Sequence, residues 1–287
     1  MAHVQTPGQG PTGPGSRPDH RGTEGAVRVV KGMGFSRTVF LLTMGFLFLP
    51  LVVLVVYSFN SAKSMSWGGF SLVWYERLFL KERNVWTAFE NSLIIAVSSA
   101  AVATCLGTLG AIGVNWYKFR FKKYIQAIAF LPLIMPEIII GVSLLIFFAG
   151  LQMKLGLFTI FIAHTSFNLP FVFLMVLARL DEFDYSIIEA SRDLGATERQ
   201  TLMKVILPVS VPGIISGFLT AVTLSLEDFV ITFFVSGPGS TTLPLYVYSM
   251  IRFGVSPVIN ALSVVLIAGT VLITILARNF LKYIAQK

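Results

Sequence analysis

Long apolar stretches separated by short polar segments dominate the chain from residue 38 onward. A membrane-spanning helix requires about 20 mainly apolar residues. The pattern predicts an all-α polytopic membrane protein with six transmembrane helices, at residues 38–59, 92–114, 125–149, 158–178, 211–235 and 258–280. The third and fifth of these stretches contain internal proline or acidic residues, so we expect them to be the least regular.

The composition agrees with lipid as the main solvent. The 287 residues are 55% hydrophobic and only 13% charged, and the mean hydropathy is +0.77. Soluble domains carry roughly 25% charged residues, so this chain has too few for an ordinary water-exposed surface. The single cysteine, Cys105, excludes a disulfide within the chain and a site built from several cysteines.

The first 33 or so residues differ from the rest, because they are rich in Gly, Pro, Arg and Thr and have no apolar periodicity. Such a segment cannot bury enough apolar surface to fold, so disorder is expected. It also lacks the apolar central region of a cleavable signal. We therefore expect residues 1–37 to be a disordered cytoplasmic tail, either native or an added leader, and residues 38–283 to be the transmembrane domain.

The distribution of Lys and Arg predicts the orientation in the membrane. Sixteen of the 22 basic residues lie in the N-terminal tail, the loops after the second and fourth stretches, and the C-terminus; six lie in the other loops. The side rich in Lys and Arg faces the cytoplasm. Both termini and the loop at residues 184–208 are therefore expected inside the cell.

The longest loop on the opposite side, residues 61–90, is studded with aromatic residues. Aromatic rings favour the headgroup level of a bilayer, so an interfacial helix is expected at residues 71–80. The alternative that Trp74 faces a ligand stays open. Residues 236–239, Ser-Gly-Pro-Gly, predict a turn without a binding role.

Residues 184–208 form a polar, charged segment between the fourth and fifth apolar stretches. Its first part predicts a short helix, and Gly195 can take the left-handed conformation that ends one. Thr197, with Gln200 three residues later, predicts a capping box for a second short helix. Pro208 is expected to end that helix. These features alone allow either a surface helical hairpin or a docking element for a soluble partner.

The same segment carries a spaced motif: Glu189-Ala190-Ser191, three further residues, Gly195, nine further residues, and Val205-Ile206-Leu207-Pro208. It resembles the signature of the permease subunits of binding-protein-dependent ABC importers, which is Glu-Ala-Ala, three residues, Gly, nine residues and Ile-x-Leu-Pro. Ser191 and Val205 depart from that signature but keep size or branching. The resemblance implies a type I ABC importer permease fold, with a cytoplasmic coupling helix between helices 4 and 5 that docks on an ATPase subunit. The residues expected to make this coupling are Glu189, Ala190, Asp193, Leu194 and Gly195.

The resemblance extends over about residues 40–283 and is similar in detail to the second permease subunit of spermidine/putrescine importers. Tyr-Ser-Phe-Asn-Ser at 57–61, Thr-Leu-Ser-Leu-Glu-Asp-Phe at 223–229 and Gly-Val-Ser-Pro at 254–257 carry it. It implies a bacterial inner-membrane protein with three kinds of partner: a dimer of ATPase subunits, a second permease subunit and an extracytoplasmic polyamine-binding protein. ATP and Mg are then bound by the ATPase, and this chain itself is expected to hold no cofactor, metal or nucleic acid.

Three acidic residues lie inside predicted spans: Glu137 in the third, and Glu227 and Asp228 in the fifth. A charge at the centre of a span costs at least roughly 2.5–3.5 kcal/mol on insertion scales, and neither span contains Lys or Arg. Such acids suit a cationic ligand, because carboxylates and aromatic faces are the groups that hold ammonium. The expected substrate path therefore includes these three residues, with a hydroxyl from Ser225 and the ring of Trp74.

Structural roles for the same residues stay open. Glu137 follows Pro136, as in the first turn of a helix restarted after a break. Glu227 and Asp228 would point about 100° apart on one helix and could not both face one pore. His164 and Asn168, four residues apart in the fourth span, are better explained by hydrogen bonds between helices than by a ligand.

The sequence contains no phosphate-binding Gly-x-x-x-x-Gly-Lys-Ser/Thr loop and no spacing typical of a catalytic triad or a metal site. It is therefore not expected to be an enzyme. The function we expect is the transmembrane permease subunit of an ATP-driven ABC importer that moves polyamines into the cytoplasm. The alternatives are an ABC permease for iron or a sugar, and a secondary transporter or channel, which would not need the hairpin at residues 184–208.

Overall fold

The computed structural model describes residues 33–63, 66–117, 120–182, 184–253 and 256–285. The described chain is helical apart from its connections and one isolated β-bridge between Asn60 and Phe70. The helices are α1 (Met33–Ser58), α2 (Val73–Leu80), α3 (Arg83–Trp116), α4 (Lys122–Ile134), α5 (Glu137–Gly150), α6 (Leu157–Asp181), α7 (Ser186–Asp193), α8 (Glu198–Thr201), the π-helical turn η1 (Leu202–Ile206), α9 (Leu207–Glu227), α10 (Val230–Val235), α11 (Leu243–Phe253) and α12 (Val258–Ala285).

The chain divides into two units within α1, after Pro50. In the first unit, the described residues 33–50 form a single helix, so residues 33–37 of the expected tail are helical. The remainder of that tail, residues 1–32, lies outside the described residues. The second unit, residues 51–287, contains all the elements considered below.

Within the described ranges, five helices are long and apolar enough to cross a membrane. They correspond to the first, second, fourth, fifth and sixth predicted stretches. The pair α4 and α5 gives a sixth span only if it is counted as one bent crossing, because the two helices meet at 106°. The all-helical, multi-span prediction is thus confirmed, but two of the spans differ from their predicted form.

The third predicted span is not one continuous helix. The helix over residues 125–149 is interrupted at Met135 and Pro136, and α5 restarts at Glu137. Met135 has an extended backbone, with ψ of 136°, because the ring of a following proline disfavours the helical conformation. The alternative view of Glu137, as a first-turn residue after a break, therefore describes its local structure.

The fifth predicted span also ends early. One helical stretch runs from Glu198 to Glu227, and Asp228 leaves it with an extended backbone (φ −64°, ψ 121°). The prediction that Pro208 ends the second helix of the loop is wrong. The turn before it is π-helical, with the Leu207 N–H bonded to the carbonyl of Leu202, and this wider turn accommodates a proline that has no N–H to donate.

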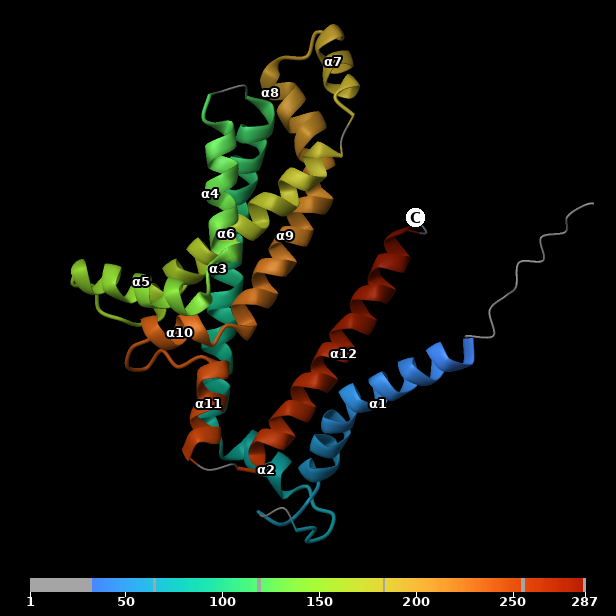
Figure 1. Cartoon of the computed structure of the whole chain (residues 1–287), viewed down its shortest axis with the longest axis vertical. Helices are drawn as coiled ribbons and strands as arrows, with labels where there is room; N and C mark the ends of the chain where they lie inside the picture. The colour runs from blue at the N-terminus through green and yellow to red at the C-terminus, as the bar shows by residue number, and fades with distance from the viewer. Residues whose placement is uncertain (1–32, 64–65, 118–119, 183, 254–255, 286–287) are drawn as a thin grey trace, which may run out of the picture. The chain divides into compact units, whose positions relative to one another are not determined.

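Helices α3, α6 and α9 pack together as the main core of the second unit (Figure 1). Small residues permit this close approach. A Cβ on Gly107 of α3 would lie 3.0 Å from the Phe173 backbone nitrogen of α6, and one on Gly217 of α9 would lie 3.1 Å from Cγ1 of Val172. Alanines complete the seam between the three helices, at Ala100, Ala103, Ala111 and Ala221.

Candidate functional site

The two helix breaks meet at one cavity. Its volume is about 300 Å³, and it lies where α5 begins and α9 ends. Helices α5 and α10 pack against each other, which brings the two breaks together. The cavity is lined by Glu137, Phe167, Leu224, Glu227, Asp228, Phe229 and Val230.

The three predicted acids therefore share a site, but their surroundings differ. Glu137 and Glu227 are exposed, whereas Asp228 is buried. Among the described residues, neither glutamate carboxylate has a hydrogen-bond partner, and no Lys or Arg lines the cavity. Two carboxylates thus face this space without a cation.

Asp228 is held by four hydrogen bonds from the protein. Its Oδ2 accepts from the Thr232 backbone N–H at 2.8 Å, from Thr232 Oγ1 at 2.7 Å and from His164 Nε2 at 3.1 Å. Its Oδ1 accepts from the Ile231 N–H at 3.2 Å. The carboxylate therefore caps the start of α10, where free N–H groups favour an anion, and ties this helix to α6.

His164 links this carboxylate to the core. Its ring is buried, and Nδ1 lies 2.6 Å from the hydroxyl of Ser225. With a proton on Nε2, that one N–H is shared between the Asp228 carboxylate and the Thr232 hydroxyl, which lies 2.9 Å from Nε2, and Nδ1 accepts from Ser225. Ser225 Oγ lies in turn 3.4 Å from Ser99 Oγ on α3. The expected helix-to-helix hydrogen bonds of His164 are confirmed.

The expectation that adjacent acids could not both face one pore is wrong for this backbone. It assumed a helix through Glu227 and Asp228, but α9 ends at Glu227. Both residues consequently line the cavity. The partner expected for Asn168 is not found either: its amide is fully buried, and neither its oxygen nor its nitrogen has a partner in the described part of the chain.

Two other predicted residues lie apart from the cavity lining. Ser225 is buried and turned toward His164. Trp74 is 4% exposed and donates its indole N–H to the Asn60 carbonyl at 2.6 Å, and it packs with Leu78 and Val258. The structure thus brings neither side chain to the three acids, and their roles on the substrate path stay predictions.

Aromatic lining residues were missed by sequence reasoning. Phe167 and Phe229 add ring faces to the cavity, and the ring of Phe229 lies 4.6 Å from that of Tyr248 on α11. The position of Phe229 directly after Asp228 was a usable signal. Phe167 carried none, because phenylalanine is common in every span of this chain.

The segment at residues 184–208 contains the predicted helical hairpin. Helix α7 ends as expected before Gly195, whose φ is +80°. The capping box is also present: Gln200 N–H donates to Thr197 Oγ1, and Thr197 N–H donates to Gln200 Oε1. The hydroxyls of Ser191 and Thr201 join the two arms at 2.7 Å.

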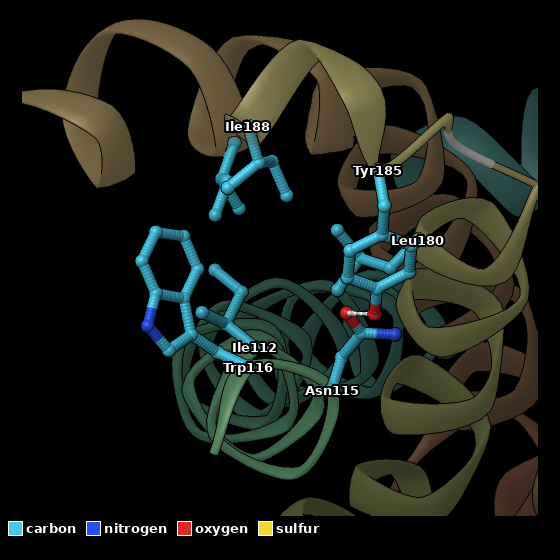
Figure 2. Close-up of a pocket in the computed structure, with 7 residues that line it drawn as sticks. Ile112, Asn115, Trp116, Leu180, Tyr185 and Ile188 are labelled. Carbon is cyan, nitrogen blue, oxygen red and sulfur yellow. Dashed lines mark hydrogen bonds between the residues drawn. The ribbon is translucent and has the colours of Figure 1, made fainter. Parts of the chain in front are cut away.

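The two faces of α7 differ. Leu194 is 89% exposed, and the other residues expected to couple to an ATPase are exposed as well. Ile188 is the buried side chain of the helix, and it faces the end of α3 (Figure 2). At the start of α7, the Ser186 N–H donates to Asp184 Oδ1, and this hydrogen bond lowers the pKa of that exposed carboxyl below its usual value.

Comparison with known proteins places these features in context. Residues 103–287 match the family described as "Binding-protein-dependent transport system inner membrane component". The chain is 37% identical over 252 residues to the spermidine/putrescine transport system permease protein PotC of Escherichia coli K12, with 88% of this chain and 93% of the relative aligned. It is 41% identical over 247 residues to the putrescine transport system permease protein PotI of the same strain, with 83% of this chain and 88% of the relative aligned.

Solved structures share the fold. A bacterial ABC transporter involved in import of the acidic polysaccharide alginate superposes with a TM-score of 0.69 at 16% identity, covering 86% of this chain and 95% of the matched chain. The MetNI methionine ABC transporter superposes with a TM-score of 0.55 at 23% identity, covering 71% of this chain and 96% of the matched chain. These likenesses confirm the predicted ABC importer permease fold.

Proposed function

Because the chain belongs to the family of inner-membrane components of binding-protein-dependent transport systems, we propose that it forms the path by which such an importer moves spermidine and putrescine into the cytoplasm. As a member, it is a multi-pass permease subunit, and the ATPase that binds ATP is a separate subunit. The choice of polyamines is supported by the names of two relatives that align over most of the chain.

The observation that carries the proposal is the pair of uncompensated carboxylates in the cavity. Glu137 and Glu227 are exposed there, on helices that break at this point. A polyamine carries an ammonium group at each end, and each can make a charge-assisted hydrogen bond to one carboxylate. Phe167 and Phe229 supply ring faces, which attract cations through their quadrupoles.

Asp228 has a different role in this proposal. Its oxygens already accept four hydrogen bonds from the protein, so it does not need an ammonium partner. It fixes the start of α10 and the turn that presents Glu227 to the cavity. The two glutamates therefore contact the ligand, and the aspartate positions them.

The exposed face of α7 is the proposed contact with the ATPase. Glu189, Ala190, Asp193 and Leu194 offer charge and apolar surface that no described part of the chain covers, and Gly195 sets the turn that presents them. The assembled importer would contain two ATPase subunits, a second permease subunit and an extracytoplasmic polyamine-binding protein. Both termini of this chain would lie in the cytoplasm, as the distribution of Lys and Arg indicates.

Uptake and co-purification test this function together. Cells with the intact system should accumulate radiolabelled spermidine, and cells lacking this chain should not. Unlabelled putrescine should compete with the label, whereas iron(III) citrate and maltose should not. A tag on this chain should also retrieve an ATPase subunit. Spermidine uptake that is independent of the chain, or inhibited by iron or sugar alone, would contradict the polyamine assignment.

A further inference from the structure

The inner face of α7 is joined to the end of α3 by side chains from both helices (Figure 2). On the α7 side, Tyr185, Ile188 and Arg192 follow one another at spacings of three and four residues, which places them on one helix face. The residues of α3 that face them are Ile112, Asn115 and Trp116. These also lie three and four residues apart and therefore share one face of α3.

Asn115 makes a polar bridge between three elements. The hydroxyl of Tyr185 donates to its Oδ1, and its Nδ2 donates to Asp181 Oδ1 at 3.0 Å. Asp181 is the last residue of α6. Both ends of one amide are therefore used, and together they tie the start of α7 to the last turns of α3 and α6.

Trp116 makes the second link. The guanidinium carbon of Arg192 lies 5.6 Å from the centroid of its ring, within the range of a cation–π contact. Between the two links, Ile188 points into a cavity of about 10 Å³ that Ile112 and Leu180 help to line. That space is at the lower limit for one water molecule, so Ile188 is packed closely against the end of α3.

A displacement of α3 would be transmitted to the cavity lined by Glu137, Glu227 and Asp228. Helix α3 packs along both α6 and α9, and it approaches α6 closely at Gly107. Further along, Ser99 contacts Ser225, which bonds to His164 beside Asp228. A continuous set of close contacts thus runs from α7 through α3 to the cavity that holds the carboxylates.

We propose that Tyr185, immediately before α7, and Ile188 and Arg192 of α7 form, with Asn115 and Trp116 of α3, a joint that transmits displacement between the ATPase-facing loop and α3. The residues of the joint are positioning residues, since they lie on the side of α7 away from the surface proposed to meet the ATPase. The proposal rests on the coupling role of α7 proposed above and does not depend on which substrate is carried.

The test uses the assembled transporter, purified through a tag on this chain and reconstituted with its binding protein carrying its own ligand. Tyr185→Phe removes one hydroxyl, and Trp116→Leu removes the ring face while keeping an apolar side chain. We expect each variant to keep its ATPase subunits and its basal ATP hydrolysis. Stimulation of hydrolysis by the binding protein should fall about two- to tenfold, as for loss of one polar or cation–π contact.

Two further variants sharpen the result. Trp116→Phe keeps an aromatic face and should retain most of the stimulation. Tyr124→Phe removes the hydroxyl of an exposed tyrosine on α4, outside the joint, and should behave as the wild type. Normal stimulation in both Tyr185→Phe and Trp116→Leu would overturn the proposal. Loss of stimulation together with detachment of the ATPase would also overturn it, because the residues would then serve attachment. Failure of wild-type spermidine uptake would contradict only the polyamine assignment.

Discussion

Three acidic side chains around one cavity differ because the backbone next to each differs. Glu137 begins a helix and Glu227 ends one, so both side chains extend from helix ends into open space. Asp228 follows directly and lies where its carboxylate can reach the free N–H groups of α10. Hydrogen bonds to a charged group contribute about 1.5–3 kcal/mol each, which favours keeping this acid as a fixed anion.

The hydroxyl of Thr232 tests that fixed position. Thr232→Val removes a buried donor to Asp228 Oδ2 and keeps the shape of the side chain. We expect the purified subunit to lose about 1.5–3 kcal/mol of stability and to melt at a lower temperature. The matched control is Thr223→Val on α9, where the exposed hydroxyl bonds only to the Leu219 carbonyl. Equal melting temperatures for the two variants would show that Asp228 does not depend on this network.

At this scale, the sequence indicates which residues carry charge but not how each is held. The cost of a carboxylate in lipid marks Glu137, Glu227 and Asp228 as special from composition alone. The division between them depends on α9 ending one residue before Asp228. The sequence has no glycine or proline at that point, so a continuous helix was the natural prediction. His164 could be expected to bond to another helix, but its partners could not be named.

At the scale of elements, the loop at residues 184–208 and the cavity are connected by one continuous helical stretch. The stretch Glu198–Glu227 contains 30 residues, or about 45 Å at 1.5 Å per residue. The capping box at Thr197 opens it, and Glu227 at its far end lines the cavity. The sequence analysis predicted a break at Pro208 and so missed this continuity. The helix continues because the π-helical turn before Pro208 accommodates a residue without an N–H.

Gly195 decides how α7 joins this helical stretch. Its φ of +80° is unfavourable for residues with a side chain and inaccessible to proline. We expect Gly195→Pro to abolish uptake and weaken ATPase attachment while the subunit still inserts into the membrane. Gly195→Asn is the control, since asparagine tolerates the left-handed conformation, and it should retain most of the uptake. Full transport by the proline variant would remove the coupling role of this turn.

Glu189 tests the exposed surface of α7 separately from its geometry. Glu189→Lys reverses one charge on the face proposed to meet the ATPase and alters no contact within the described chain. We expect loss of co-purified ATPase subunits with an unchanged amount of the permease in the membrane. Glu198→Lys, another exposed acid in the first turn of α8, serves as the control. Equal ATPase recovery from both variants and the wild type would exclude Glu189 from the docking surface.

For the whole molecule, hydropathy predicted the number of apolar stretches, and a spaced motif indicated the family. Both signals come from short range: about 20 apolar residues for a span, and fixed intervals for the motif. The 106° bend between α4 and α5 and the helix α11, which the sequence analysis did not predict, depend on packing between distant segments. The spacing of apolar residues within a short segment does not predict such contacts between distant segments.

The orientation in the membrane is a property of the whole chain. A reporter that is active only in the cytoplasm should be active when fused after Lys123, after Lys204 or at the C-terminus. Fused after Lys63 or Arg252, it should be silent, because these positions lie on the side with few basic residues. An active fusion after Arg252 would contradict the six-span arrangement with both termini inside.

The concentration dependence of spermidine uptake in charge-neutral variants tests the account most directly. Glu137→Gln and Glu227→Gln keep shape and remove a ligand contact, so each should raise the KM by about 10- to 150-fold, equivalent to roughly 1.5–3 kcal/mol, at normal subunit levels. Asp228→Asn should instead lower the amount of folded subunit, because it weakens the cap of α10. Unchanged KM values in both glutamine variants would contradict the account, since the cavity carboxylates would then not hold the substrate.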